Sequence, residues 1–332
     1  MKIRLGQKII SERSEPFIVA EVGSNFDQSI NKAFKLIDVA KKCKADAVKF
    51  QLFDGKVLYP NNKKMRKLFE KNQLNSDWIP ILKKYCIKKK INFFLSPFDE
   101  KSLDILIKNK IKFYKIASSE IVNLALIKKI AKEKQPVFLS TGMSDLDDVK
   151  KAVRVIKSFN NNKIVIMQCC SLYPLKDSLT NLNVLDTFGK KFKNILGFSD
   201  HTLGFEASII AMGKGARVFE KHLTLNKKSK GRDHHYSLNP VEFKNYVIKL
   251  KNCYRMLGSS KKEMLTAEKK RGRREGLYFA KSKSKNSRVK KDDLYSKRPS
   301  LGVRSKYLIN ILNKKLVKNV KKNTPVYLEN LK

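Results

Sequence analysis

Short apolar runs alternate with amphipathic stretches along the first 260 residues of the chain. The amphipathic stretches place apolar residues at helical spacing, whereas each apolar run has the length of a buried strand. Strands that alternate with helices indicate a parallel sheet, and eight of them can close a (β/α)8 TIM barrel. We therefore predict the α/β class, with a TIM barrel over residues 1–260. The predicted strands span 17–22, 46–51, 91–96, 113–118, 136–141, 163–170, 194–200 and 216–222, and the predicted helices include 31–43, 77–90, 99–109, 123–133, 145–158 and 240–257.

The main alternative to a barrel is an open, doubly wound parallel sheet. Such a sheet usually carries a G-x-G-x-x-G turn after its first strand. The corresponding segment here, "EVGSNFDQS" at 21–29, lacks that pattern. The closed barrel is therefore the favoured interpretation.

The pattern changes after residue 260. Residues 261–275 are highly charged and typical of a linker. From residue 276, short strand-like pieces such as "LYFAK" and "TPVYLENL" are separated by turn residues, which predicts a small β-rich domain over 276–332. A basic tail that binds nucleic acid is the rival interpretation, but the interspersed apolar residues could form a core.

The chain is strongly basic, with a formal net charge of +43 over 332 residues. Such a charge is typical of proteins that bind nucleic acid or anionic membranes. However, only 13 of the 73 basic residues are Arg, the residue that reads bases and clamps phosphates, and the lysines are dispersed along the predicted helices. We expect a solvated lysine surface with no nucleic-acid partner, whose field favours small anionic substrates.

The apolar pattern gives no sign of membrane insertion or secretion. No apolar run approaches the length of a membrane span, and the run "FIVAEV" is too short for a signal peptide. The five cysteines are odd in number and form no C-x-x-C motif, which favours reduced thiols. We expect a cytoplasmic protein without a membrane partner.

All four histidines of the chain fall between residues 201 and 235. His201 follows the seventh predicted strand and His222 ends the eighth, so both lie at the carboxyl ends of neighbouring strands. Because i and i+2 share a face of a strand, Ser199 points the same way as His201, and Glu220 the same way as His222. Adjacent strands lie about 4.8 Å apart. We therefore predict one divalent metal ion on the two histidines, with water and substrate oxygens as its other ligands.

Lysines, hydroxyls and carboxylates gather at the ends of the other predicted strands. Lys49 and Lys115 lie inside apolar strands, where burying a lysine is costly unless an anion meets it. Hydroxyls and loop N–H groups can complete a phosphate cradle around them. Glu21 and Glu120 are candidates for acid–base catalysis, although pairing with the lysines would also explain them. The candidate hydroxyls are Ser96, Ser118, Ser140, Thr141 and Ser199, and Gln51 shares the face of Lys49.

These strand-end residues lie in segments that resemble the sialic acid synthase family, also called NeuB-like. The matching segments, in order, are "IVAEVGSN", "ADAVKFQ", "SPFD", "YKIASSEI", "LSTGM", "GFSDHTLG", "EKHLTL" and "GRDHHYSLNP". In the tail, "LYFAK" and "SKRPSLG" resemble the antifreeze-like (SAF, β-clip) domain that follows the barrel in this family. One such motif would be weak support, but the ordered series is specific and covers nearly the whole chain.

The resemblance implies a reaction and roles for single residues. The family condenses phosphoenolpyruvate with an N-acylated hexosamine, such as N-acetylmannosamine or a 2,4-diacetamido-trideoxyhexose, to a nine-carbon 3-deoxy-2-keto acid and phosphate. By this resemblance His201 and His222 bind Mn²⁺ or Mg²⁺, and Glu120 is the acid–base carboxylate. The SAF domain of one subunit would close over the other subunit's barrel in a homodimer and bring Arg298 to the substrate. The expected positions around phosphoenolpyruvate are Lys49, Lys115, Ser118, Ser140 and Ser199, and those near the sugar are Gln51, Tyr173 and Asp233.

The chain also departs from the family pattern at several positions. Phe26 replaces a frequent histidine, Arg232 a common proline, and Ser300 the glycine of the usual R-P-G. Several departures line the sugar side, so the acceptor stays open. Two other functions remain as alternatives: another phosphoenolpyruvate-dependent synthase that acts on a phosphorylated sugar, and a basic nucleic-acid-binding protein.

Overall fold

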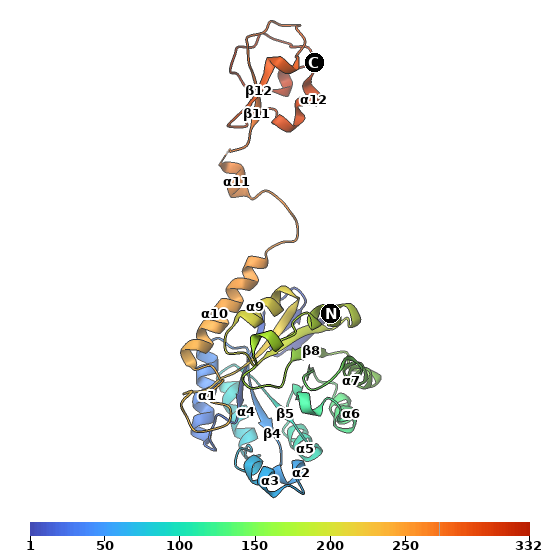
Figure 1. The fold of residues 1–332 in the computed structure, drawn as a ribbon, viewed down its shortest axis with the longest axis vertical. Coiled ribbons are helices and arrows are strands. Elements are labelled where there is room, and N and C mark those ends of the chain that lie inside the picture. Colours follow the sequence, from blue (N-terminus) through green and yellow to red (C-terminus); the bar gives the residue numbers. More distant parts are fainter. Residues whose placement is uncertain (272) are drawn as a thin grey trace. The chain divides into compact units, whose positions relative to one another are not determined.

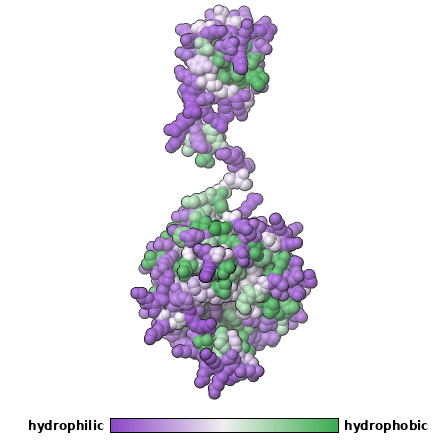
Figure 2. Space-filling view, viewed as in Figure 1, coloured by the Kyte–Doolittle hydropathy of each residue, from purple (hydrophilic) through white to green (hydrophobic). Residues whose placement is uncertain are grey.

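A computed structural model describes residues 1–271 and 273–332 of the protein. The chain forms two compact units, Met1–Gly258 and Ser259–Lys332, and each is described by itself. Hydrophilic side chains cover most of the face of each unit that Figure 2 shows, as expected for a lysine-rich surface. None of the helices in the described part of the chain has both the length and the apolar composition needed to span a membrane.

The first unit, all of whose residues are described, closes a barrel of eight parallel strands in the order β10-β3-β4-β5-β6-β7-β8-β9 (Figure 1). The TIM barrel prediction is therefore confirmed. Each predicted strand appears within a few residues of its expected limits. The strands are β3 (Phe17–Gly23), β4 (Ala47–Leu52), β5 (Asn92–Pro97), β6 (Tyr114–Ile116), β7 (Val137–Ser140), β8 (Ile164–Cys169), β9 (Ile195–Asp200) and β10 (Ala216–His222).

Helices surround the barrel and bury their apolar stripes against the outer faces of the strands. The predicted helices are present as α1 (Ile30–Lys42), α4 (Trp78–Lys88), α5 (Glu100–Lys108), α6 (Leu124–Lys132), α7 (Leu146–Ser158) and α10 (Pro240–Leu257). Sequence periodicity did not reveal α2 (Gly55–Leu58), α3 (Lys63–Glu70), α8 (Val184–Lys191) or α9 (Glu206–Gly213). These four are only four to eight residues long, too short for a clear helical period.

Local capping chemistry fixes where the long helices begin. Asn239 accepts hydrogen bonds from the N–H groups of Val241 and Glu242, and the Glu242 carboxylate accepts one from the Asn239 N–H. This capping box, with Pro240 at the first helical position, satisfies N–H groups that have no partner inside the helix. The capping box therefore fixes Asn239 as the residue at which the loop after β10 ends and α10 begins.

An amino-terminal hairpin, β1 (Lys2–Leu5) and β2 (Lys8–Ser11), precedes the barrel. Ile3, Leu5 and Ile10 join inward-facing strand residues such as Phe17 and Phe138 in one buried cluster. Phe17 begins β3, so this cluster fills the amino-terminal end of the barrel. The other end, where the polar strand-end residues lie, is left for chemistry.

The second unit has its own small core. Strands β11 (Gly276–Phe279) and β12 (Leu294–Lys297) pair antiparallel, and isolated bridges such as Lys283–Val320 connect the remaining segments. Helices α11 (Thr266–Lys270) and α12 (Leu308–Ile311) are short, and residue 272 of the predicted linker lies outside the described residues. The SAF assignment of this unit stays a prediction. Its core comprises Leu277, Phe279, Val289, Val303, Ile311, Leu316, Val320 and Val326.

A buried carboxylate in the second unit forms ion pairs and a backbone hydrogen bond with three lysine residues. Asp293 is 1% exposed; it lies 3.0 Å from the Lys281 ammonium, contacts that of Lys283, and accepts the Lys290 N–H at 2.8 Å. Burial by itself raises the pKa of Asp293, but these three partners outweigh it and lower the pKa to about 2. The folded pKa is thus below the ordinary value of 3.8, so the carboxylate stabilises the unit above about pH 4, and this stabilisation is lost toward pH 2.

Replacing Asp293 with Asn should therefore lower the free energy of unfolding of residues 276–332 by about 2 kcal/mol at pH 7. The difference from the parent should shrink at pH 3. Urea-dependent hydrogen exchange of peptides from this unit, measured in the full chain, reports the change. The exposed neighbour Asp292 is the matched control, and a D293N chain as stable as D292N at pH 7 would contradict the prediction.

Candidate active site

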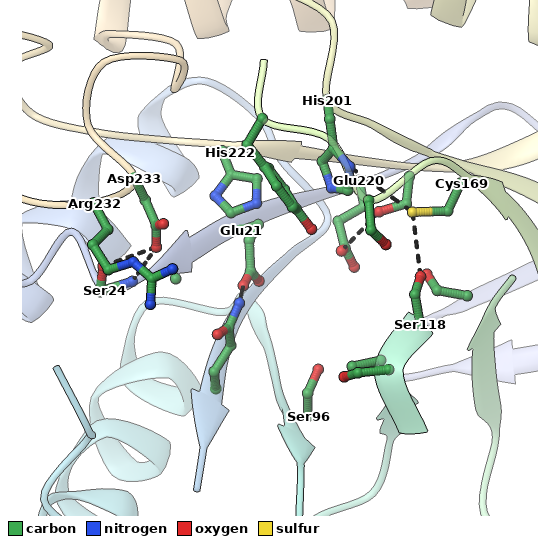
Figure 3. Close-up of a pocket in the computed structure, with 18 of the residues that line it drawn as sticks. Glu21, Ser24, Ser96, Ser118, Cys169, His201, Glu220, His222, Arg232 and Asp233 are labelled. Carbon is green, nitrogen blue, oxygen red and sulfur yellow. Dashed lines mark hydrogen bonds between the residues drawn. The ribbon is translucent and has the colours of Figure 1, made fainter. Parts of the chain in front are cut away.

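A cavity of about 630 Å³ opens at the carboxyl end of the barrel strands (Figure 3). Every barrel strand or the loop after it contributes to the lining. The structure brings most of the predicted site residues together here. Those that line the cavity are Glu21, Lys49, Gln51, Ser96, Lys115, Ser118, Ser140, Tyr173, Ser199, His201, His222 and Asp233.

Two buried lysines and two buried glutamates alternate across the floor of this cavity. The Glu220 Oε1 lies 2.8 Å from the Lys115 ammonium and 3.2 Å from that of Lys49. Lys49 in turn lies 3.2 Å from Glu21 Oε2, and Gln51 donates to Glu21 Oε1 at 2.8 Å. These residues come from β3, β4, β6 and β10, so only closure of the barrel brings them together.

The number of charged neighbours decides how each of these groups titrates. Burial lowers the pKa of both lysines, but Lys49 has two carboxylates beside it and its pKa ends above the ordinary value. Lys115 has one, and its pKa ends below the ordinary value. Although burial opposes ionisation of Glu220, the two ammonium groups hold its pKa well below the usual range. Burial raises the pKa of Glu21 to about 7, because Lys49 only partly offsets it.

Hydroxyl groups and one backbone N–H lie beside the lysines. The Ser199 hydroxyl donates to Glu220 at 3.2 Å, and Lys49 donates to the Ser96 hydroxyl at 3.2 Å. The Gly142 N–H donates to the Ser118 hydroxyl at 3.1 Å, and a Cβ at Gly142 would lie 2.8 Å from that oxygen. The Ser140 hydroxyl is buried without a hydrogen-bond partner in the described part of the chain. Donors beside two ammonium groups suit an anionic ligand.

His201 and His222 lie side by side at the ends of the neighbouring strands β9 and β10, with ring centroids 5.7 Å apart. The His201 Nδ1–H donates to the Cys170 carbonyl at 2.8 Å, so Nε2 is free to bind a metal whenever the ring is neutral. Burial lowers the pKa of His201, but Cys169 beside the ring outweighs it and the pKa ends above the ordinary value. Burial lowers the pKa of His222 to about 3, which keeps that ring neutral, and its Nδ1 has no hydrogen-bond partner among the described residues. Neutral imidazoles with an unpaired nitrogen suit a divalent metal ion.

The histidine pair supplies two ligands, and the described residues hold no group of three or more His, Cys, Asp or Glu placed to bind a metal. The chemistry of the pair thus fits an open catalytic centre that takes its other ligands from substrate and water. A thiol adjoins this pair: Cys169 lies 3.4 Å from the Ser118 hydroxyl and 3.9 Å from the His201 ring nitrogen.

The loop after β10 is fastened to the loop after β3 by Asp233. Its Oδ2 accepts the Ser24 N–H at 2.9 Å and the Ser24 hydroxyl at 2.8 Å, and its Oδ1 accepts the Tyr236 hydroxyl at 2.7 Å. The Tyr173 ring lies 4.2 Å from that of His201 and 5.2 Å from that of Tyr236. Asp233 and Tyr173 therefore line the same side of the cavity as the two histidines.

Gly23 makes this fastening possible. Its φ is +54°, and a Cβ there would lie 2.5 Å from Asp233 Oδ2. Gly23→Ala should therefore strain the backbone, displace Asp233 and lower stability by about 1–3 kcal/mol. Thermal unfolding of the full chain measures the loss. Gly189→Ala is the matched control: it lies in α8, where a Cβ meets only Leu196 at 3.8 Å, so it should stabilise slightly. Equal melting temperatures for the two variants would contradict this account.

Three predicted residues are not part of the cavity lining. The hydroxyl of the buried Thr141 donates to the Met167 carbonyl at 2.9 Å. Glu120 ends the 3-10 turn Ser118–Glu120 and accepts a hydrogen bond from Asn123 at 3.4 Å. Arg298 belongs to the second unit, where its exposed side chain lies 3.7 Å from Glu275. The roles expected for all three stay predictions.

Sequence reasoning also missed residues that line the cavity. Glu220 shares a strand face with His222, a signal that places its carboxylate toward the cavity, yet we did not expect it in the site. Cys169 ends β8, and its alternation with Cys170 leaves one thiol facing inward. Three phenylalanines also line the cavity: Phe53, Phe69 and Phe98. Nothing in the sequence distinguishes them from apolar residues of the hydrophobic core.

The chain is similar in sequence and in fold to several known proteins. The NeuB family model matches residues 36–262. An N,N'-diacetyllegionaminic acid synthase of Legionella pneumophila is 32% identical over 95% of this chain and 94% of that protein. An uncharacterized protein of Methanocaldococcus jannaschii is 35% identical over 99% of this chain and 98% of its own. The crystal structure of the N-acetylneuraminic acid (sialic acid) synthetase of Leptospira borgpetersenii, in complex with citrate, is similar with a TM-score of 0.78 and 31% identity, over 82% of this chain and 95% of that one.

Proposed function

Because this chain belongs to the NeuB family, we propose that it is a nonulosonic acid synthase, a transferase that joins phosphoenolpyruvate to an N-acylated hexosamine. The products would be a nine-carbon 3-deoxy-2-keto acid and phosphate. The observation that carries the proposal is one cavity that is lined both by a buried lysine pair and by two neighbouring histidines.

The lysine side of the cavity suits phosphoenolpyruvate, which carries a phosphate and a carboxylate. Glu220 holds Lys49 and Lys115 in place before the substrate arrives. An anion that enters meets two buried ammonium groups and nearby hydroxyls, and charge interactions with buried groups are stronger than those in bulk water. The hydroxyls are those of Ser96, Ser118, Ser140 and Ser199.

The histidine side suits the aldehyde of the open-chain sugar. His201 and His222 would hold a divalent metal ion, Mn²⁺ or Mg²⁺, which as a Lewis acid polarises the aldehyde. Carbon C3 of phosphoenolpyruvate would then bond to the aldehyde carbon, and the aldehyde oxygen would take up a proton. Glu21, buried beside Lys49, is the cavity carboxylate placed to hold that proton on Oε2. Water would add at C2, and the C2–O bond to phosphate would break.

The test is phosphate release from phosphoenolpyruvate by the full chain with Mn²⁺ and a panel of N-acylated hexosamines. We expect release that needs both an acceptor and the metal, with a product mass equal to the sum of both substrates plus water minus phosphoric acid. No release with any acceptor would overturn the proposal. We also expect no nucleic acid to compete with phosphoenolpyruvate at physiological salt.

We further propose a homodimer in which the second unit of one subunit contributes Arg298 to the other subunit's cavity. A guanidinium keeps its charge at any working pH, and the Arg298 side chain is 66% exposed and so accessible to a second chain. An Arg298→Ala chain mixed with a His222→Ala chain should regain activity, since a mixed dimer can assemble one site without either defect. No recovery, despite demonstrated subunit exchange, would contradict the arrangement in trans.

A further inference from the structure

Three phenylalanine rings form one wall of the cavity near its mouth. Phe53, Phe69 and Phe98, called here the aromatic wall, pack edge to face, with Phe53 centred 5.3 Å from Phe69 and 5.7 Å from Phe98. All three line the cavity. Three rings that lie together in a cavity with so many charged and hydroxyl groups indicate that part of the ligand is apolar.

The position of the wall follows from strand alternation. Lys49, Gln51 and Phe53 point to the same side of β4 and its extension, each two residues closer to the mouth than the one before. Phe98 directly follows the end of β5, and Phe69 comes from α3. The wall therefore lies farther out than Gln51, beyond the lysine that would contact phosphoenolpyruvate.

Arg232 extends the wall from the loop after β10. Its guanidinium lies over the Phe69 ring, with Cζ 5.4 Å from the ring centroid. Figure 3 shows Arg232 next to Asp233 and Ser24, on the opposite side of the cavity from Ser118 and Cys169. The wall thus belongs to the end of the cavity away from the hydroxyl cradle, where the far end of the acceptor sugar would lie.

The chemistry of this end selects for a flat, uncharged group. The face of an aromatic ring carries negative charge density and disfavours a phosphate dianion. Among the described lining residues, Arg232 is the one Lys or Arg outside the buried pair of lysines, so a phosphate here would meet a single cation. By contrast, stacking on Phe69 occupies the guanidinium face and leaves its N–H edges to donate to a carbonyl oxygen.

A secondary amide with a methyl group satisfies each of these features. Its plane can stack on the rings, its methyl group buries apolar area, and its carbonyl can accept from Arg232. Asn72, which also lines the cavity, donates its Nδ2 to the Leu68 carbonyl at 2.7 Å, so its Oδ1 can accept the amide N–H. These contacts contribute more binding free energy for an acylamino group than for a hydroxyl at the same position of the sugar.

We propose that the aromatic wall and Arg232 bind a second acylamino group of the acceptor sugar. The inference rests on the synthase function proposed above and makes it specific. The preferred acceptor would be a hexose with two acylamino groups and no phosphate, such as a 2,4-diacetamido-trideoxyhexose, in preference to N-acetylmannosamine or its 6-phosphate.

The experiment compares three acceptors with the full chain, phosphoenolpyruvate and Mn²⁺: 2,4-diacetamido-2,4,6-trideoxymannose, N-acetylmannosamine and N-acetylmannosamine 6-phosphate. We expect kcat/KM for the diacetamido sugar to exceed that for N-acetylmannosamine by roughly 30-fold, the combined effect of a buried methyl and an amide hydrogen bond. The 6-phosphate should be the poorest acceptor.

Two variants test whether the wall causes this preference. Phe69→Leu keeps apolar bulk but removes the flat ring, and Arg232→Leu removes the donor. Each should reduce the ratio of the two kcat/KM values roughly fivefold or more, mainly by raising KM for the diacetamido sugar. Phe205→Leu is the matched control, because Phe205 also lies under a cation, Lys249 at 3.4 Å, but does not line the cavity.

The outcomes separate this inference from the proposed function. Equal kcat/KM for the diacetamido and monoacetamido sugars, or a preference for the 6-phosphate, would overturn the inference and leave the synthase function standing. A strong preference that both wall variants retain would also overturn it. No phosphate release with any of the three sugars would overturn both.

Discussion

Replacing His222 with Ala should abolish metal-dependent phosphate release, with a loss of roughly a thousandfold or more. The reason is that the described residues offer the metal one pair of imidazoles and no cluster of three ligands, so neither histidine has a substitute. A metal held by two protein ligands loses half of its protein coordination in the variant. Titration of Mn²⁺ followed by electron paramagnetic resonance measures metal affinity without relying on turnover.

A second histidine provides the control for this prediction. His235 is exposed and packs edge-on against Tyr236 at 5.0 Å, so His235→Ala removes an imidazole without removing a metal ligand. We expect it to keep its Mn²⁺ affinity, and both variants to keep the circular dichroism spectrum of the parent. A folded His222→Ala chain that binds Mn²⁺ within threefold of the parent would refute the metal site.

Replacing Lys115 with Met should raise KM for phosphoenolpyruvate more than tenfold. A charge-assisted contact to an anion contributes about 1.5–3 kcal/mol, and Met keeps most of the side-chain volume. The same change should lower the free energy of unfolding, since Glu220 loses the ammonium at 2.8 Å and keeps Lys49 and the Ser199 hydroxyl, each at 3.2 Å. Breaking a buried ion pair on one side costs about 3–5 kcal/mol, and the remaining lysine should reduce this loss.

The double variant Lys115→Met/Glu220→Gln separates binding from stability. Removing both charges restores neutrality around Lys49 and Glu21, so most of the lost stability should return. The KM for phosphoenolpyruvate should stay high, because no second ammonium remains to meet the phosphate. The exposed Lys112→Met is the control for loss of a positive charge. If the double variant recovered the parent's KM, Lys115 would serve only to balance Glu220.

The sequence predicts the strands of the barrel well, but it predicts short helices and side-chain contacts poorly. Strand limits in the barrel agree to within a few residues, since a buried parallel strand between two helices leaves an unmistakable short apolar run. Short helices such as α3 left no such period, although α3 carries Phe69 into the cavity. Glu120 was expected in the site both from its place after a predicted strand and from the family pattern; its carboxylate accepts a hydrogen bond from Asn123, and its role stays a prediction.

The sequence by itself determined which residues stand at strand ends and which way they face, because alternation along a strand is a local property of the backbone. From it came the expectation that the lysines, serines and histidines share one mouth. Only the tertiary structure decided that Glu220 lies between Lys49 and Lys115. Lys115 and Glu220 are 105 positions apart in the chain. That contact crosses the barrel. It depends on the stagger of the strands around the closed barrel, which is a property of the whole sheet and cannot be predicted from any single segment of the sequence.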